Sequence, residues 1–145
     1  MLIRKPVQED FAAWSELYEG YARFYAVEQT AEMRSRVWGW IQDPDHEVQG
    51  LVAEDEGRLL GLTHFRPFAR PLSASVGGFL DDLFVSPDAR GSGAAAALIA
   101  GVEAEGRRRG WTVIRWITAE NNYRARGLYD QVAVRTPWLT YDIKL

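Results

Sequence analysis

Cysteine is absent from this sequence of 145 residues, and histidine occurs only at His46 and His64. Without cysteine the chain has no disulfide framework, no thiolate zinc site and no cysteine nucleophile. Two histidines also make a histidine-based catalytic triad or a multi-histidine metal site a poor candidate. We therefore expect no bound metal.

Long apolar runs are missing as well, since no stretch approaches the roughly 18 residues that span a membrane. The N-terminal segment becomes acidic at Glu9 and Asp10, unlike a secretory signal. With a net charge of −3, the chain lacks the basic surface on which general nucleic-acid binding depends. We expect one domain over residues 1–145, located in the cytoplasm, with neither nucleic acid nor a membrane as its partner.

Apolar periodicity and turn residues divide the chain into alternating strands and helices. Helices are predicted over residues 9–25, 30–41, 93–109 and 124–132, and strands over residues 2–4, 48–54, 59–65, 79–85, 111–118 and 138–144. Residues 66–78 form a loop or a widened hairpin. Aromatic residues recur at helical spacing in the first two helices, which is typical of a core or a dimer face. The order of the elements predicts a mixed α/β or α+β layer fold.

Residues 80–95 are the most informative part of the sequence, because a strand there runs into a turn with two glycines and then into an alanine-rich helix. Gly91 and Gly93 permit unusual backbone dihedrals and the close approach of a ligand. The N-terminus of the following helix offers unpaired N–H groups and the positive end of a dipole to a diphosphate. Arg90 adds a positive charge at this turn. The pattern is neither a Walker loop nor a dinucleotide fingerprint.

Two motifs in this half of the chain resemble those of the GNAT N-acetyltransferase superfamily. Arg90-Gly-Ser-Gly-Ala-Ala95 fits the family's Arg/Gln-x-x-Gly-x-Gly/Ala signature, and Asn122-Tyr-Arg-Ala-Arg-Gly-Leu-Tyr129 resembles its Asn-x-x-Ala-x-x-Leu/Phe-Tyr helix. The resemblance implies an α/β (α+β) fold with a central mixed sheet of about six to seven strands and about four flanking helices. Two parallel strands would splay apart to admit acetyl-CoA as the co-substrate.

The resemblance also implies which residues bind the coenzyme. Main-chain groups of Leu83, Phe84 and Val85 would pair with the pantetheine arm, to which Asn122 would also hydrogen-bond. The diphosphate would be cradled by Arg90, Gly91, Ser92, Gly93, Ala94, Ala95 and Ala96. Arg124 or Arg126 would meet a coenzyme phosphate, and Ala125 is the alanine of the second motif.

The strand Leu80-Asp-Asp-Leu-Phe-Val85 resembles the Leu-Glu-Asp-Phe-Phe-Val strand of the spermidine/spermine acetyltransferases. This likeness places Asp81 at a carboxylate implicated in deprotonating the amine, and Tyr129 at the tyrosine that protonates the leaving thiolate. Asp81 is one methylene shorter than glutamate, which favours a bridging water over direct contact. An alternative for Asp81 and Asp82 is one buried and one exposed structural carboxylate, because neighbours on a strand face opposite sides.

The chemistry of acetyl transfer requires such groups. An alkylammonium with a pKa near 10 must lose a proton before its nitrogen attacks a thioester, and the departing thiolate gains from a nearby donor. We therefore predict an acetyl-CoA-dependent N-acetyltransferase that acts directly, in a ternary complex, on a primary amine of a small polyamine-like or amino-acid-like molecule. A protein lysine or N-terminal acetyltransferase and a non-catalytic acyl-CoA-binding module stay open as alternatives. The aromatic face of the first helices would allow a homodimer.

Overall fold

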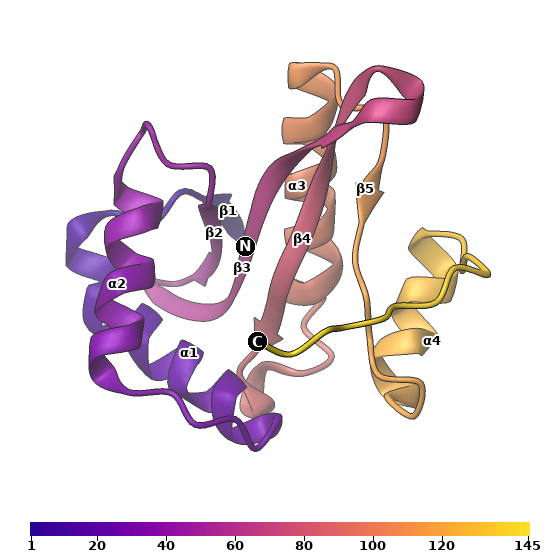
Figure 1. The fold of residues 1–145 in the computed structure, drawn as a ribbon. Helices are drawn as coiled ribbons and strands as arrows, with labels where there is room; N and C mark the ends of the chain where they lie inside the picture. Colours follow the sequence, from indigo (N-terminus) through magenta and orange to yellow (C-terminus); the bar gives the residue numbers. More distant parts are fainter.

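A computed structural model describes the whole chain from Met1 to Leu145. Five strands form one sheet in the order β1-β2-β3-β4-β5 (Figure 1). The strands are β1 (Leu2–Arg4), β2 (Gln49–Asp55), β3 (Arg58–Arg70), β4 (Ser75–Val85) and β5 (Ile114–Arg115). Neighbours from β1 to β4 pair antiparallel, whereas β5 pairs parallel with β4. The prediction of a mixed sheet is confirmed.

Four α-helices surround this sheet: α1 (Phe11–Phe24), α2 (Ala31–Gln42), α3 (Ala94–Arg109) and α4 (Tyr123–Val132) (Figure 1). On one face, Trp14 of α1 and Trp38 of α2 pack on Leu62 of β3. On the opposite face, Val102 of α3 packs with Phe65 of β3. The aromatic residues Trp14 and Trp38 are 1% and 7% exposed, so these two belong to the core.

Local signals explain why the helices begin and end close to the predicted positions. The Thr30 side chain accepts a hydrogen bond from the backbone N–H of Met33 at 3.1 Å and caps α2. Gly110 ends α3 with a φ of +74°, a left-handed conformation that glycine adopts without a steric penalty. No helix combines the length and the apolar character needed to cross a membrane.

The sheet has five strands rather than the expected six to seven. The strand predicted over residues 111–118 pairs only at Ile114 and Arg115. Residues 138–144 form no strand at all, and Trp138, Tyr141 and Ile143 are 82%, 89% and 89% exposed. Because β5 is so short and α4 leads the chain away from it, this segment finds no neighbouring strand within its own sheet. We call residues 134–145 the C-terminal arm; it is the extended yellow segment in Figure 1.

The region of residues 66–78 is the widened hairpin, because β3 continues to Arg70 and β4 begins at Ser75. The pairing of β3 with β4 is interrupted at one point. His64 pairs with Asp82 and Phe65 pairs with Leu80, so a bulge lies on β4 between these two pairs. This bulge falls beside the two aspartates of β4 and shapes the site described next.

Candidate active site

β4 and β5 separate at the point where the predicted coenzyme site begins. They pair only at Gly78 with Ile114 and at Phe79 with Arg115, and β4 then continues to Val85 without a neighbour on that side. A cavity of about 430 Å³ opens in this gap, lined by the end of β4, the glycine turn, the start of α3 and α4. The structure therefore contains the predicted splayed strand pair.

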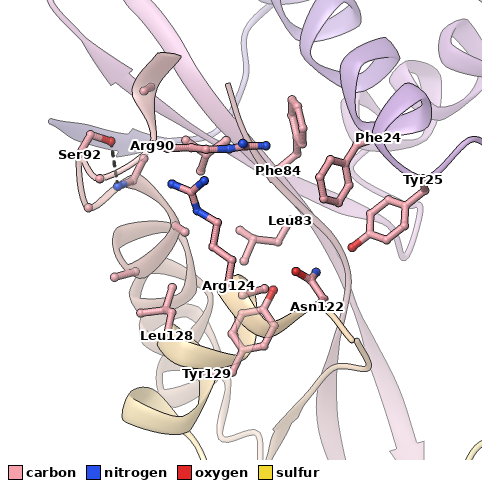
Figure 2. A pocket seen from close by; sticks show the side chains of 18 residues that line it. Phe24, Tyr25, Leu83, Phe84, Arg90, Ser92, Asn122, Arg124, Leu128 and Tyr129 are labelled. Atoms are coloured by element: carbon pink, nitrogen blue, oxygen red, sulfur yellow. Dashed lines mark hydrogen bonds between the residues drawn. The ribbon is translucent and has the colours of Figure 1, made fainter. Parts of the chain in front are cut away.

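All residues predicted to bind the coenzyme, apart from the alternative Arg126, line this cavity (Figure 2): Leu83, Phe84, Val85, Arg90, Gly91, Ser92, Gly93, Ala94, Ala95, Ala96, Asn122, Arg124 and Ala125. Tyr129 lines it as well. Arg126 does not, and its guanidinium donates to the backbone carbonyl of Glu120 instead.

The sequence analysis missed four lining residues: Phe24, Tyr25, Ala89 and Leu128. Phe24 and Tyr25 follow the helical spacing of the core residues, and no sequence signal separates them from those. Only the packing of α1 beside β4 brings them to the cavity.

The turn between β4 and α3 presents a group of unpaired hydrogen-bond donors. Gly91 and Gly93 have φ values of +82° and +87°, which residues with a side chain rarely adopt. The backbone N–H groups of Gly93, Ala95 and Ala96 find no acceptor within the protein. They lie at the positive end of the α3 dipole, an arrangement suited to a bound phosphate.

Two arginines add positive charge to this turn. Arg124 directs its guanidinium toward the glycine turn, whereas the Arg90 side chain extends from the turn toward Phe24, with its guanidinium carbon 5.9 Å from the ring centroid (Figure 2). Neither forms an ion pair with a carboxylate of the protein. Unpaired guanidinium groups above free backbone donors fit the phosphate groups of coenzyme A.

Tyr129 faces the cavity from α4, two helical turns after Asn122. The Tyr129 hydroxyl, the Asn122 amide and the Tyr25 hydroxyl are directed toward the same part of the cavity (Figure 2). The Tyr129 ring packs edge-on against Trp116, with ring centroids 5.4 Å apart. Burial, with a smaller contribution from Tyr25, raises the pKa of Tyr129 to about 12. The phenol therefore keeps its proton at neutral pH.

The two carboxylates of β4 lie on the same face of the sheet, which differs from the alternation that the structural alternative for this pair assumed. The register pairs His64 with Asp82 and then skips Asp81, which is the extra residue of the bulge. Arg66 donates to a carboxylate oxygen of Asp81 at 3.1 Å, and His64 contacts Asp82 at 2.8 Å. Since His64 and Arg66 are two residues apart on β3, their side chains point to one face, and so do their partners.

Asp81 and Asp82 nevertheless have different surroundings. The Asp81 side chain is 32% exposed and is not among the residues that line the cavity. Burial raises the pKa of Asp81, and the nearby Arg66 offsets only part of this effect. The Asp82 side chain is 20% exposed and directly precedes Leu83, which lines the cavity. Its contact with His64 is a feature that the sequence analysis did not foresee.

Comparisons with known proteins agree with this geometry. Residues 14–133 match the model of the acetyltransferase (GNAT) family. An uncharacterised N-acetyltransferase, YhfO of Bacillus subtilis, is 30% identical over 132 residues, which are 90% of this chain and 87% of the relative. The D-amino-acid N-acetyltransferase HPA3 of Saccharomyces cerevisiae is 27% identical over 135 residues, 92% of this chain and 84% of the relative.

Solved structures share the fold over the full length. A ribosomal-protein-alanine N-acetyltransferase from Brucella melitensis superimposes with a TM-score of 0.82 at 25% identity and covers 100% of both chains. The aminoglycoside N-acetyltransferase AAC(6')-Iy, solved with coenzyme A, has a TM-score of 0.85 at 19% identity and covers 99% of this chain and 93% of its own.

A splayed strand pair that ends in a glycine turn with free N–H donors fits the class of transferases that use an acyl-coenzyme A. The chain belongs to the acetyltransferase (GNAT) family. It is an acetyl-CoA-dependent N-acetyltransferase, with acetyl-CoA as its co-substrate.

Proposed function

We propose that this enzyme acetylates the primary amine of a small, positively charged acceptor that is polyamine-like or amino-acid-like. The observation that carries the proposal is the pair of carboxylates, Asp81 and Asp82, on one face of β4 directly before the cavity. Arg66 balances one of the two negative charges, and the pair keeps a net negative charge that attracts a cation to this position. The likeness of residues 80–85 to the spermidine/spermine acetyltransferases supports the same class of acceptor.

Relatives support a small acceptor in general terms. One relative is named as a D-amino-acid N-acetyltransferase, and a structural neighbour as an aminoglycoside N-acetyltransferase. The likeness to a ribosomal-protein-alanine N-acetyltransferase favours a second candidate function, acetylation of a protein N-terminus.

In the proposed reaction, coenzyme phosphates bind the N–H groups of the glycine turn together with Arg90 and Arg124. Unpaired main-chain groups of residues 83–85 and the Asn122 amide hold the pantetheine arm. These roles follow from the free donors that face the cavity. With these roles we expect the thioester beside Tyr129, next to Leu83, which directly follows the two carboxylates on β4.

Acetyl transfer then needs one proton acceptor and one proton donor. Asp81, whose pKa is raised by burial, accepts the proton of the ammonium directly or through a water molecule. The amine nitrogen forms its bond to the acetyl carbon as the carbon–sulfur bond breaks. Tyr129 donates its hydroxyl proton to the departing thiolate, and the second proton that the nitrogen loses on becoming an amide returns Tyr129 to its neutral form, directly or through a water molecule. No residue forms a covalent intermediate, in keeping with a chain that has no cysteine.

A panel of acceptors tests this function. Small cationic amines, lysine peptides and peptides with a free N-terminus are incubated with acetyl-CoA, and release of the coenzyme thiol is measured. We expect turnover with the small amines and only the hydrolysis background with the peptides. Preferred turnover of an N-terminal peptide would favour the second candidate, and binding of acetyl-CoA without any acetylation would identify an acyl-CoA-binding module.

The same assay examines Asp81. Asp81→Asn should lower kcat/KM most at a pH below the pKa of the amine and recover part of it at alkaline pH, because an amine that is already free needs no proton acceptor. Asp130→Asn, an exposed change on α4, is the matched control. A pH–rate profile of Asp81→Asn identical to that of the wild type would assign Asp81 a purely structural role.

We also propose that the C-terminal arm contacts a second copy of the chain. Leu139, Tyr141, Ile143 and Leu145 alternate with polar residues and are 78%, 89%, 89% and 117% exposed, a pattern typical of a half-buried strand. Burial of a large side chain removes roughly 150 Å² from water, so these residues and Trp138 from two exchanged arms would bury on the order of 1,500 Å². A stable interface needs about 1,200–2,000 Å².

Sedimentation velocity tests this partner. We expect the full chain to sediment as a dimer at micromolar concentration and a chain that ends at Ala133 to sediment as a monomer. A full chain that stays monomeric under these conditions would show that the arm has another role.

A further inference from the structure

A buried chain of hydrogen bonds connects the core to Asp82. The indole N–H of Trp14 donates to Nε2 of His64 at 3.0 Å. Nδ1 of His64 lies 2.8 Å from Oδ2 of Asp82, and the Tyr18 hydroxyl donates to the same oxygen at 2.9 Å. Trp14 and His64 are 1% and 2% exposed, so water cannot replace either partner.

The chemistry of these groups determines the protonation of His64. An indole N–H can only donate, so Nε2 of His64 must carry the lone pair that accepts from Trp14. The imidazole proton is therefore on Nδ1, where it donates to Asp82. A second proton on Nε2 would point at the indole N–H and break that bond. Trp14 thus holds His64 as the neutral Nδ1–H tautomer.

This arrangement keeps Asp82 ionised and leaves one of its oxygens free. Burial alone would raise the pKa of Asp82, but donation from His64 and Tyr18 outweighs burial and lowers it, with Tyr21 nearby. The short bonds from His64 and Tyr18 both go to Oδ2 and leave Oδ1 for a ligand, with the smaller contribution of the Tyr21 hydroxyl as the third hydrogen bond to this carboxylate. The other charged group that faces Asp82 and His64 is Asp81, which is itself paired with Arg66. The pKa of Asp81 is therefore raised, whereas the pKa of Asp82 is lowered.

A row of tyrosines on α1 leads from Asp82 to the cavity. Tyr18, Tyr21 and Tyr25 lie on one face of the helix, with ring centroids 6.1 Å apart for the first pair and 5.0 Å for the second. The Tyr21 hydroxyl is close enough to both Asp82 and Tyr129 for each to influence its pKa. Tyr21 therefore lies between Asp82, which is not a lining residue itself, and Tyr129, which lines the cavity.

We infer that Asp82 is the binding site for the ammonium form of the acceptor, and that Trp14 and His64 are positioning residues that keep its negative charge constant across the physiological pH range. The inference rests on the proposed function and assigns separate roles to the two aspartates. Asp82 binds the charged amine through Oδ1 and stays ionised, whereas Asp81 takes the proton that the amine loses. The enzyme should therefore select amines that are cationic at neutral pH.

Two tryptophan variants test the positioning role. In Trp14→Phe, Nε2 of His64 loses its donor and is free to take a proton below about pH 6.5, where an imidazole ordinarily titrates. The resulting imidazolium would neutralise Asp82 in acid. Trp38→Phe removes an indole from the same cluster, 5.0 Å from the Trp14 ring, and its N–H has no partner to lose. It is the matched control for lost packing.

The measurement is the KM for ethylamine between pH 5.5 and 8. We expect a KM that stays nearly constant in the wild type and in Trp38→Phe, but rises about fivefold toward acid in Trp14→Phe, the loss of one partly exposed charge interaction. The KM for acetyl-CoA should not follow this change. Trifluoroethylamine is uncharged at neutral pH. Its KM at that pH should be high and should be the same in the wild type, Trp14→Phe and Trp38→Phe. Equal pH dependence in the two tryptophan variants would overturn the inference.

An NMR experiment keeps the inference testable if Trp14→Phe fails to fold or if no amine is acetylated. The nitrogen shifts of His64 in the wild type should report the Nδ1–H tautomer and stay constant between pH 5.5 and 8, with His46→Gln used to assign the only other imidazole. Addition of ethylammonium should change the His64 nitrogen shifts in the wild type and leave those of Asp82→Asn unchanged. A titrating His64, or equal perturbation of both proteins, would overturn the inference. Absence of turnover alone would count against the proposed function only.

Discussion

Replacing Tyr129 with phenylalanine is expected to lower the turnover number about 10²- to 10⁴-fold, the usual contribution of a positioned general acid. The affinity for acetyl-CoA should stay nearly constant, because the ring that lines the cavity is retained. Stability should change little as well, since the ring keeps its contact with Trp116 and the hydroxyl bonds to no other group of the protein. Because a slow release step can mask the chemical step, turnover should be compared in single-turnover experiments.

The pKa of Tyr129 adds a pH criterion to this experiment. A pKa raised to about 12 means that the phenol is protonated throughout the range below that value. The wild type should therefore show no loss of rate from this group up to about pH 11. Tyr123→Phe, on the same helix but 74% exposed, is the matched control and should retain full activity. A folded Tyr129→Phe enzyme with undiminished single-turnover rate would falsify the role.

The second large effect is expected at the glycine turn. Gly93→Val should weaken acetyl-CoA binding on the order of 100-fold, because a branched side chain would occupy the approach to the free N–H groups of α3. Hydrogen bonds to charged groups are each worth about 1.5–3 kcal/mol, so the loss of one or two accounts for such a change. Isothermal titration calorimetry measures it directly.

Gly57→Val provides the control for backbone strain. Gly57 has a φ of +80°, close to the +87° of Gly93, and at neither position would a Cβ meet another atom within 4 Å. Both variants therefore pay a similar cost for a left-handed valine. Gly57 lies in the turn between β2 and β3, outside the cavity, so Gly57→Val should bind acetyl-CoA like the wild type. Unchanged affinity in a folded Gly93→Val protein would show that the diphosphate does not bind at this turn.

Much of the proposed coenzyme site was predictable because the two motifs that carry the family resemblance are local. The two positive-φ glycines, the following helix N-terminus and the spacing from Asn122 to Tyr129 each act within a few residues. Backbone conformation and helical periodicity turn such spacings into geometry without help from the rest of the chain. The boundaries of α2 and α3 were predictable for the same reason, through the cap at Thr30 and the left-handed Gly110.

The remaining features depend on contacts between distant parts of the chain. Regular alternation along β4, the basis of the structural alternative for Asp81 and Asp82, would put them on opposite faces, and only the bulge in the pairing with β3 places both on one face. Trp14 and His64 are separated by fifty positions and meet because α1 packs on β3. Whether an alternating segment becomes a strand depends on a neighbour to pair with, which β5 is too short to offer the C-terminal arm. The sequence by itself determined the fold class and the glycine turn before α3, because these follow from local conformation. The tertiary structure alone decided the arrangement of the carboxylates, because pairing register and packing are properties of the assembled sheet.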